Sequence, residues 1–197
     1  MQLYKAHVLS YVEFSTPAVY HAPSFFLSQI DRVQDTFLEE LDVSPVVALM
    51  EFNLAPLATR RDIAMMGLLF RIARGHAPPQ FSRIIRQCSH EPFPRCLRQG
   101  ERHNLQMHDP IDGTHSRMMG RSCLSLIYTF NMLPQSVLDL KTASAFQLCL
   151  QNVVKLAAQR EIADWPCFLH AGVRAMNASS FQSFFDAPRS AQGRSSR

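Results

Sequence analysis

The pattern of apolar and polar residues predicts helices along most of the chain, and the strongest of them covers residues 56–74. In this segment apolar side chains occupy most of the helical circumference, and Arg60, Arg71 and Arg74 share one narrow face with Gly67. Pro56 suits the first turn of a helix, where a missing N–H costs nothing, and Gly75 suits the position just after its end. Because a helix that is apolar on most sides has to be covered by other elements, we expect this segment to be the central helix of the fold.

Three shorter helices are predicted before the central one. Residues 3–15 carry apolar side chains at helical spacing, and the segment 16–23, which contains two prolines, is predicted to be a connector. Residues 25–41 have an amphipathic pattern with an apolar stripe of Phe26, Ile30, Val33, Phe37 and Leu41. A serine followed by a proline at 44–45 is typical of a helix start and predicts a short helix over 46–52.

Helices are also predicted after the central one, with one open alternative. Residues 80–86 fit a short helical piece, and residues 142–160 repeat apolar side chains every three and four positions. Residues 117–131 fit a helix as well. Within that segment, residues 124–130 fit a buried strand equally well, because periodicity alone does not separate a short apolar helix from a buried strand.

Together these elements predict an all-α fold, an irregular helical bundle in two clusters. The first cluster covers residues 1–82, and the second covers 116–170. A long loop rich in proline and glycine, residues 83–115, is predicted to join them. The last segment, 171–197, is rich in Ser, Ala, Gln and Arg and is predicted to be a disordered basic tail.

Composition favours a folded intracellular protein with apolar surface. Hydrophobic residues make up 47% of the 197 residues, which is ample for a core, while only 18% are charged. No run approaches the about 18 apolar residues that a membrane span needs, and no secretory signal is evident, so we expect neither a membrane partner nor secretion. Five scattered cysteines, an odd number, are typical of reduced thiols in the nucleus or cytoplasm.

Charge is divided unevenly along the chain. Residues 1–55 hold seven acids and two bases, a net charge of −5, whereas residues 56–102 hold nine arginines and three acids, a net charge of +6. Arginine suits phosphate contacts and carboxylate pairing equally well. The basic segment therefore predicts either a nucleic-acid footprint or a surface on which the acidic first third docks. The candidate phosphate contacts are Arg60, Arg61, Arg71, Arg74, Arg83 and Arg86.

No motif for catalysis or for a cofactor is present in the sequence. Cysteines and histidines gather in one window, comprising Cys88, His90, Cys96, His103, His108 and His115. Their spacing lacks the paired ligands, two to four residues apart, of structural zinc sites, so we predict loop residues without metal. Asp109 and Asp112 fit a turn better than a metal site, because Pro110 and Gly113 are turn formers. We expect no catalytic residues and no cofactor.

Two blocks of the chain resemble one family. Residues 8–72 are similar to the region that follows the palm and thumb in reverse transcriptases of non-LTR (LINE-type) retrotransposons. The matching positions there are Leu27, Ile30, Val33, Gln34, Phe37, Leu38, Leu54, Pro56, Leu57, Arg60 and Arg61. Residues 121–151 resemble the terminal block of such proteins. The matching positions there are Arg121, Ser122, Asn131, Leu133, Pro134, Ser144, Phe146 and Leu150.

The resemblance implies a helical fragment of a transposable element, close to template RNA or target DNA. The palm with its catalytic aspartates has no counterpart in this sequence, so the resemblance does not imply catalysis. Two hypotheses follow. In the first, the chain is a non-catalytic remnant that binds RNA or DNA phosphates through the arginines. In the second, it is a helical protein-interaction or structural fragment, with a polymerase-bearing protein as one partner.

Overall fold

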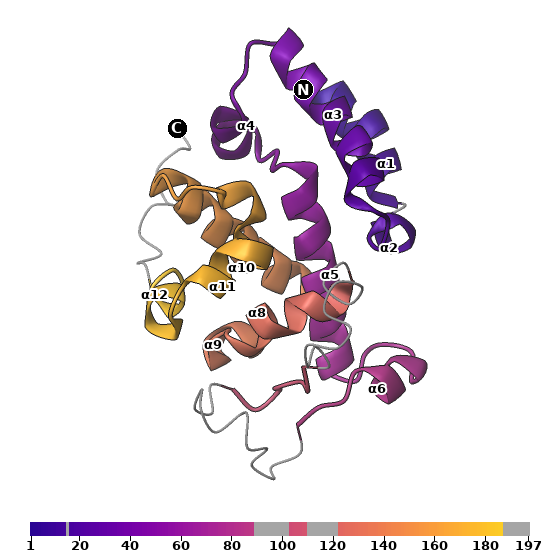
Figure 1. The fold of residues 1–197 in the computed structure, drawn as a ribbon, viewed down its shortest axis with the longest axis vertical. Helices are drawn as coiled ribbons and strands as arrows, with labels where there is room; N and C mark the ends of the chain where they lie inside the picture. The colour runs from indigo at the N-terminus through magenta and orange to yellow at the C-terminus, as the bar shows by residue number, and fades with distance from the viewer. Residues whose placement is uncertain (15, 89–102, 110–121, 187–197) are drawn as a thin grey trace.

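Helices dominate the part of the chain that the structure describes. The computed structural model describes residues 1–14, 16–88, 103–109 and 122–186. Within these ranges the helices are accompanied by no strand, only by an isolated antiparallel bridge between Gln87 and Met107 (Figure 1). The all-α prediction is therefore confirmed.

The helical elements fall into two parts along the chain, before and after residues 85–122. The first part of the chain contains η1 (Tyr4–Leu9), α1 (Ser10–Phe14), α2 (Thr16–Val19), α3 (Ser24–Glu40), α4 (Pro45–Phe52), α5 (Leu57–Ala73) and α6 (Gln80–Ile84). The second part contains η3 (Cys123–Leu126), α8 (Ile127–Asn131), α9 (Gln135–Leu138), α10 (Ala143–Gln159), η4 (Trp165–Cys167), η5 (Phe168–Gly172), α11 (Val173–Ala175) and α12 (Ala178–Gln182). Residues 124–130, for which a strand was the alternative, are helical throughout.

Helix α5 is the central helix, as the sequence predicted. It runs through the middle of the molecule, with α1–α3 on one side and α8–α12 on the other (Figure 1). Pro56 precedes its first turn, and Gly75 follows its last turn with φ of +71°, a left-handed conformation that suits glycine. Most of its side chains are buried, among them Met66 and Leu69 with no exposed surface. Its apolar circumference is therefore covered by neighbouring elements.

The helix that packs most closely on α5 is α10, which lies 70 residues or more further along the chain. The rings of Phe70 and Phe146 stack with centroids 4.5 Å apart. Gly67 brings the two helices together, because a Cβ at this position would lie only 2.5 Å from Nε2 of Gln147. Both helices in this pair were predicted, but their pairing was not.

Hydrogen bonds at two helix starts match the sequence signals. The Ser44 side chain accepts a hydrogen bond from the Val47 N–H at 3.3 Å, with Pro45 in the first turn of α4. The Thr142 side chain accepts from the Ala145 N–H at 3.1 Å and begins α10. Capping satisfies N–H groups that have no partner within a helix, so local sequence fixes these boundaries.

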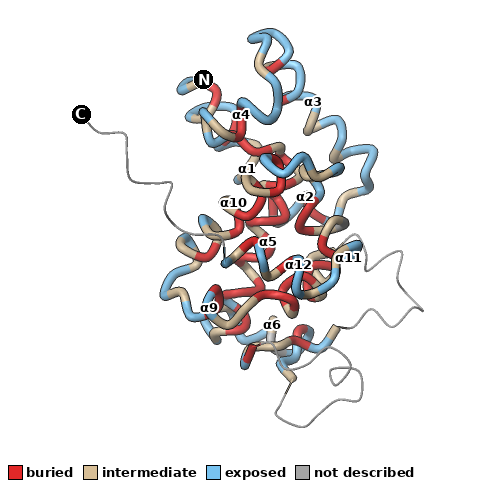
Figure 2. The backbone as a smooth tube through the Cα atoms, turned by 90° about the vertical axis from the view of Figure 1, so that its left-hand side faces the viewer, coloured by how far each residue is buried: buried red, intermediate tan, exposed pale blue. Residues whose placement is uncertain are grey.

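The buried side chains divide differently from the predicted clusters. The larger hydrophobic cluster joins α5 to α8, α10 and the elements after α10, so it crosses the predicted 83–115 boundary (Figure 2). The smaller cluster consists of Tyr4, Leu9, Leu38, Ala48, Leu54 and Leu57. The division thus falls near the start of α5. Prediction placed it in the loop because sequence spacing carries no information on which helices pack together.

Three segments that were predicted to be irregular are packed or helical. Residues 16–19 form α2, inside the predicted connector. Part of the predicted loop returns to the core, because Met107 is 1% exposed and the Cys88 N–H donates to the Gln106 carbonyl at 2.9 Å. Most of the described part of the predicted tail is helical too, and it adds side chains to the core. These are Val173, Phe181 and Phe184.

Candidate interaction surfaces

Arg61 is a structural residue rather than an exposed cation. Its guanidinium donates from Nη1 and Nη2 to the two carboxylate oxygens of Asp31, at 2.6 and 2.9 Å. The Arg61 side chain is 8% exposed and that of Asp31 is 28% exposed. A guanidinium whose two Nη atoms both bind a carboxylate, and which is shielded from solvent, has few N–H groups left for a phosphate.

Two further candidate arginines also have partners within the chain. The Arg60 Nε donates to the carboxylate of Glu13, which links α5 to α1. The Arg74 Nη1 donates to the carbonyls of Leu138 and Leu140 at 2.8 and 3.2 Å. Arg60 and Arg61 therefore pair with acids of the first third of the chain, which was one of the two alternatives for the basic segment.

The remaining three candidates, Arg71, Arg83 and Arg86, are exposed. They belong to the last turns of α5 and to α6 and the residues just after it, at the end of the molecule opposite α4 (Figure 1). The narrow face predicted for the central helix is not an uninterrupted row in solvent, because Gly67 on that face is buried against α10.

Helix α3 buries only part of the predicted stripe: Ile30 and Phe37 are partly buried and pack against the smaller cluster. Gln34 is 2% exposed and donates to the Ala55 carbonyl at 3.0 Å, and Leu38 is 3% exposed. Phe26 and Val33, which belong to the predicted apolar stripe, are 59% and 46% exposed. Prediction chose the most apolar stripe. The structure instead buries a polar side chain that satisfies a backbone carbonyl.

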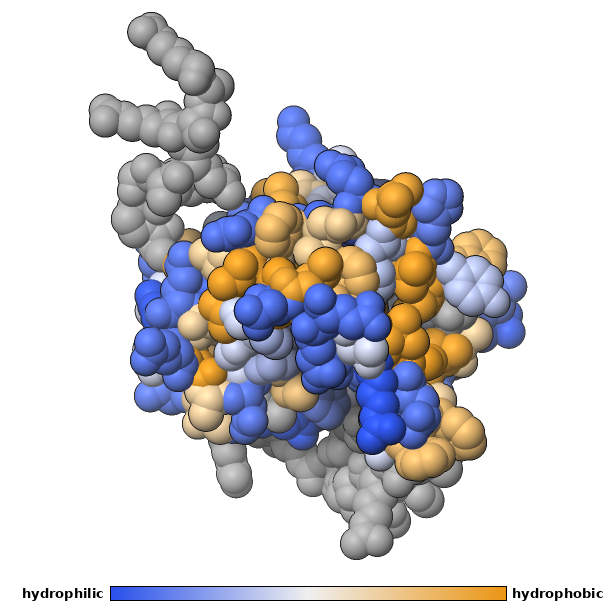
Figure 3. Space-filling view, turned by 90° about the horizontal axis from the view of Figure 1, so that it is seen from above, coloured by the Kyte–Doolittle hydropathy of each residue, from blue (hydrophilic) through white to orange (hydrophobic). Residues whose placement is uncertain are grey.

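Large apolar side chains of the first residues, of α1 and of α3 are exposed to solvent. We define the N-terminal apolar surface as Leu3, Tyr11, Phe14, Phe25, Phe26 and Val33, with exposures of 75%, 82%, 90%, 66%, 59% and 46%. The stacked rings of Tyr4 and Phe37, 4.1 Å apart, hold η1 against α3 beside this surface. Seen from above, orange apolar side chains lie between blue hydrophilic ones (Figure 3).

The charges near this surface are mostly negative. The exposed acids of α3, α4 and the turn between them are Asp35, Glu39, Glu40, Asp42 and Glu51, whereas Arg32 is the exposed base of α3. Partial burial, with smaller effects from the Asp31 and Glu39 charges, raises the pKa of Asp35 above its ordinary value. A ligand with positive charge therefore suits this end of the molecule.

A buried polar network joins α5 to the residue that follows α2, and sequence analysis did not identify it. The Tyr20 hydroxyl donates to the Asp62 carboxylate at 2.8 Å. Burial raises the pKa of Asp62, against the opposing effects of the Tyr20 hydrogen bond and the nearby His170 and Arg61 charges. These residues are far apart in sequence, and no motif connects them.

Ser125 and His170 are within hydrogen-bond distance, with Oγ and Nε2 2.8 Å apart. The Ser125 hydroxyl also lies 2.8 Å from the Ser122 carbonyl, so its single proton has two acceptors within reach. Ser125 is only 2% exposed, which gives a substrate little access to its hydroxyl.

The metal candidates are only partly within the described residues. Cys88, His103, His108 and Asp109 are described, and His90, Cys96, His115 and Asp112 lie outside the described residues. His103 is 7% exposed, with its Nε2 3.1 Å from the Phe130 carbonyl. In the described ranges, no three histidine, cysteine, aspartate or glutamate side chains group as a metal ion would require.

Comparison with family models, with curated proteins and with solved structures finds no match to this chain. None of the helices in the described ranges has the length and apolar character needed to span a bilayer. The resemblance to the reverse transcriptase region therefore stays a prediction.

Proposed function

We propose that this chain is a non-catalytic interaction module that binds a basic amphipathic helix of a partner protein on its N-terminal apolar surface. The observation that carries this proposal is the exposure of Phe14, Phe25 and Phe26, at 90%, 66% and 59%. Exposed apolar side chains mark interaction sites where they are adjacent to one another, as the Phe25 and Phe26 rings are, with centroids 5.6 Å apart.

The energetics favour a protein partner at this surface. Covering a large apolar side chain contributes about 1.5–3 kcal/mol, so a few such contacts sustain a specific complex. An amphipathic helix presents apolar anchors at intervals of three and four residues. The surface along α1 and α3 is long enough for several such anchors, because α3 alone has 17 residues. The exposed acids in the second half of α3 and in α4 lie toward one end of this surface, and there they favour a basic flank on that helix over an acidic one.

The resemblance drawn from the sequence supports this proposal indirectly. A region that follows the palm and thumb of a polymerase would have that protein as a neighbour, so a polymerase-bearing protein is one candidate partner. The proposal itself depends only on the exposed side chains and on the charges around them.

Two synthetic helical peptides test the proposal. Both carry the same leucines on one face, one with lysine flanks and the other with glutamate flanks. Fluorescence anisotropy should show that the lysine peptide binds and the glutamate peptide does not, with weaker binding at high salt. The double variant Phe14→Ser, Phe26→Ser should lower affinity for the lysine peptide by about tenfold or more, because it removes two apolar contacts.

Ile84→Ser is the matched control, because Ile84 is 68% exposed but lies on α6, away from the N-terminal apolar surface. It should bind the lysine peptide as the wild type does. Equal loss of binding in the control, or none in the double variant, would contradict the proposal. Self-association of the wild type by light scattering that Phe14→Ser abolishes would make a second copy the partner instead.

A second candidate function, binding of nucleic-acid phosphates, is favoured by the exposure of Arg71, Arg83 and Arg86. Such binding is independent of base sequence, and its affinity falls steeply with salt. If three arginines each neutralise one phosphate, the slope of log affinity against log salt is about −2 to −3.

Filter binding of a single-stranded RNA and a duplex DNA at two salt concentrations tests the second function. The triple variant Arg71→Gln, Arg83→Gln, Arg86→Gln should abolish binding. Arg32→Gln, an exposed arginine among acids on α3, is the control and should bind as the wild type does. Absence of binding at low salt, or an unchanged triple variant, would reject it.

A further inference from the structure

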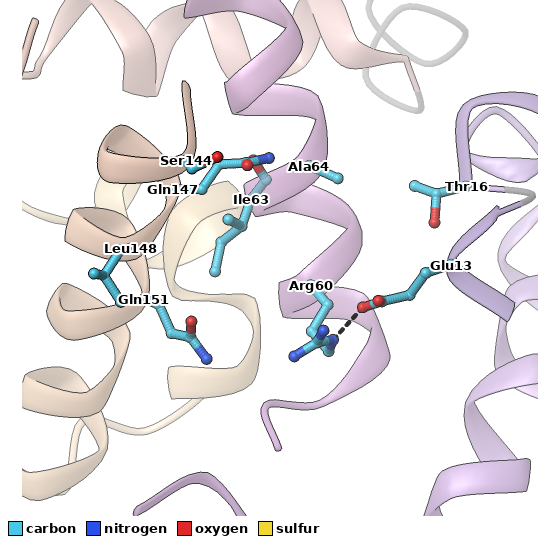
Figure 4. Close-up of a pocket in the computed structure, with 9 residues that line it drawn as sticks. All are labelled: Glu13, Thr16, Arg60, Ile63, Ala64, Ser144, Gln147, Leu148 and Gln151. Atoms are coloured by element: carbon cyan, nitrogen blue, oxygen red, sulfur yellow. Dashed lines mark hydrogen bonds and ion pairs between the residues drawn. The ribbon is translucent and has the colours of Figure 1, made fainter. Parts of the chain in front are cut away.

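A groove lies alongside α5, between α1 and α10 (Figure 4). Arg60, Ile63 and Ala64 of α5 form its floor, and Glu13 and Thr16 form one wall. The other wall comes from α10 and consists of Ser144, Gln147, Leu148 and Gln151. Its volume is about 350 Å³, within the range of small-ligand sites (Figure 4).

The charged groups in the groove neutralise each other. Arg60 donates to Glu13 across the groove, and the other lining residues are uncharged (Figure 4). An anion would have to displace the Glu13 carboxylate from Arg60, and a cation would have to displace Arg60 from Glu13. The groove therefore favours a ligand without net charge.

The polar lining suits peptide groups. Gln147 and Gln151 are one turn apart on α10. The Gln147 Nε2 donates to the Ile63 carbonyl at 3.5 Å, so Gln147 offers its amide oxygen as an acceptor, whereas the Gln151 amide carries both a donor and an acceptor. A main-chain amide also offers one donor and one acceptor, so the pairing is complementary. Ile63 on the floor and Leu148, which is 54% exposed, supply apolar surface between these polar groups.

The length of the groove fits a short extended segment. From Ser144 to Gln151, α10 rises about 10 Å, which an extended chain covers with about three residues.

We propose that this groove binds an extended, uncharged peptide segment of about three residues, with Gln147 and Gln151 bonding its main chain and an aliphatic side chain resting on Ile63 and Leu148. The site is separate from the N-terminal apolar surface, and the proposal does not rest on the function proposed above. The ligand would be a main-chain segment of another protein or of a small peptide.

Blocked tripeptides titrated into the isotope-labelled full chain test this site. The test peptides are N-acetylated, C-amidated Ala-Leu-Ala, Ala-Asp-Ala and Ala-Lys-Ala. The side-chain amide signals of Gln147 and Gln151 should shift with the leucine peptide at about 10 mM, well above a millimolar dissociation constant, and shift less with the charged peptides. Gln151→Ala should lower affinity for the leucine peptide about fivefold, through loss of its hydrogen bonds.

Gln159→Ala, an exposed glutamine at the end of the same helix, is the matched control and should leave the affinity unchanged. Phe26→Ser should also leave it unchanged, which separates this site from the N-terminal apolar surface. No shift of either glutamine signal, tighter binding of the aspartate peptide, or an equal loss in Gln159→Ala would overturn the proposal.

Discussion

Removal of Arg61 would leave the Asp31 carboxylate without the two hydrogen bonds that it now accepts. Breaking a buried ion pair costs about 3–5 kcal/mol. Because Asp31 keeps 28% exposure and regains some hydration, we expect Arg61→Ala to lower the free energy of unfolding by about 2–3 kcal/mol. Urea denaturation followed by circular dichroism measures the change.

A double-mutant cycle with Asp31→Ala isolates the pair. The sum of the two single losses of stability should exceed the loss in the double variant by about 1 kcal/mol or more, because both single variants remove the same interaction. Arg83→Ala, at an exposed position, is the control and should stay within about 0.5 kcal/mol of the wild type. Equal effects of Arg61→Ala and Arg83→Ala would show that Arg61 is exposed in solution.

Asp62 should make the stability fall as the pH rises. Burial raises its pKa above the ordinary value of 3.8, so the folded protein holds this proton more tightly than the unfolded chain does. The stabilisation is complete below pH 3.8 and is lost as the pH rises through the folded pKa. Tyr20, Arg61 and His170 face this carboxyl group, and their opposing effects are smaller than that of burial.

Asp62→Asn isolates this effect, because asparagine keeps an acceptor for the Tyr20 hydroxyl and does not titrate. The free energy of unfolding of the variant minus that of the wild type should increase between about pH 4 and pH 7. Urea denaturation at several pH values gives the difference directly. A decrease over this interval would mean that the Arg61 and His170 charges outweigh burial.

At the scale of elements, the close approach of α5 and α10 depends on Gly67. A Cβ there would meet Nε2 and Cδ of Gln147, at 2.5 and 2.9 Å. The end of a flexible side chain can move, and alanine is favoured over glycine within a helix by about 1 kcal/mol, so Gly67→Ala should change stability by less than about 1 kcal/mol. Gly67→Leu should cost about 3 kcal/mol, because its extra atoms reach α10.

Thermal unfolding of both variants measures these differences. Ala64→Leu, one turn earlier on α5 and only partly buried on the groove floor, is the matched control for added volume and should cost less than Gly67→Leu. If Gly67→Leu were as stable as the wild type, α5 and α10 would not be in contact at this position.

Helix positions were predictable from the sequence, whereas the sides that helices bury were not. Local signals decide the starts of α4 and α10, since the Ser44 and Thr142 side chains bond N–H groups three residues away. The buried side of α3 depends on distant partners. Gln34 is buried because it reaches the Ala55 carbonyl, 21 residues further along the chain.

The same reasoning explains why the candidate site was only partly predictable. The charge distribution predicted pairing between the arginine-rich segment and the acidic first third as one alternative, and Arg60 and Arg61 form such pairs. It could not choose between phosphates and carboxylates for Arg60 and Arg61, because that choice depends on how α1 and α3 lie against α5. The groove beside α5 carries no sequence signal at all, since its lining comes from segments about 50 and 130 residues apart.

At the scale of the whole molecule, contacts between distant segments hold the described chain together around α5. The Thr59 hydroxyl donates to the Pro166 carbonyl at 2.6 Å, across 107 residues of sequence. The Thr129 hydroxyl donates to the Leu169 carbonyl at 2.6 Å. Each bond ties a helix of the larger cluster to the segment after α10, so that segment is part of the core rather than an appendage.

Deletion of residues 173–197 tests whether the segment predicted to be a disordered tail is required for folding. Val173, Phe181 and Phe184 are buried in the larger cluster, and the rings of Phe168 and Phe184 lie 5.0 Å apart. Each buried side chain contributes about 1.5–3 kcal/mol, so the deletion removes about 4–9 kcal/mol, a large part of the total stability of a domain this size. We expect loss of the cooperative unfolding transition in circular dichroism.

Deletion of residues 187–197 alone is the matched control, because it removes basic residues of the tail while keeping Phe181 and Phe184. This shorter deletion should unfold at the same urea concentration as the full chain. Phe184→Ala in the full chain separates the core contact from chain length and should cost about 3 kcal/mol, since the ring packs on Phe168 and under the Arg160 guanidinium. If the 173–197 deletion unfolded like the full chain, the buried side chains of α11 and α12 would contribute nothing to stability. The core would then end with η5, as the sequence pattern alone suggested.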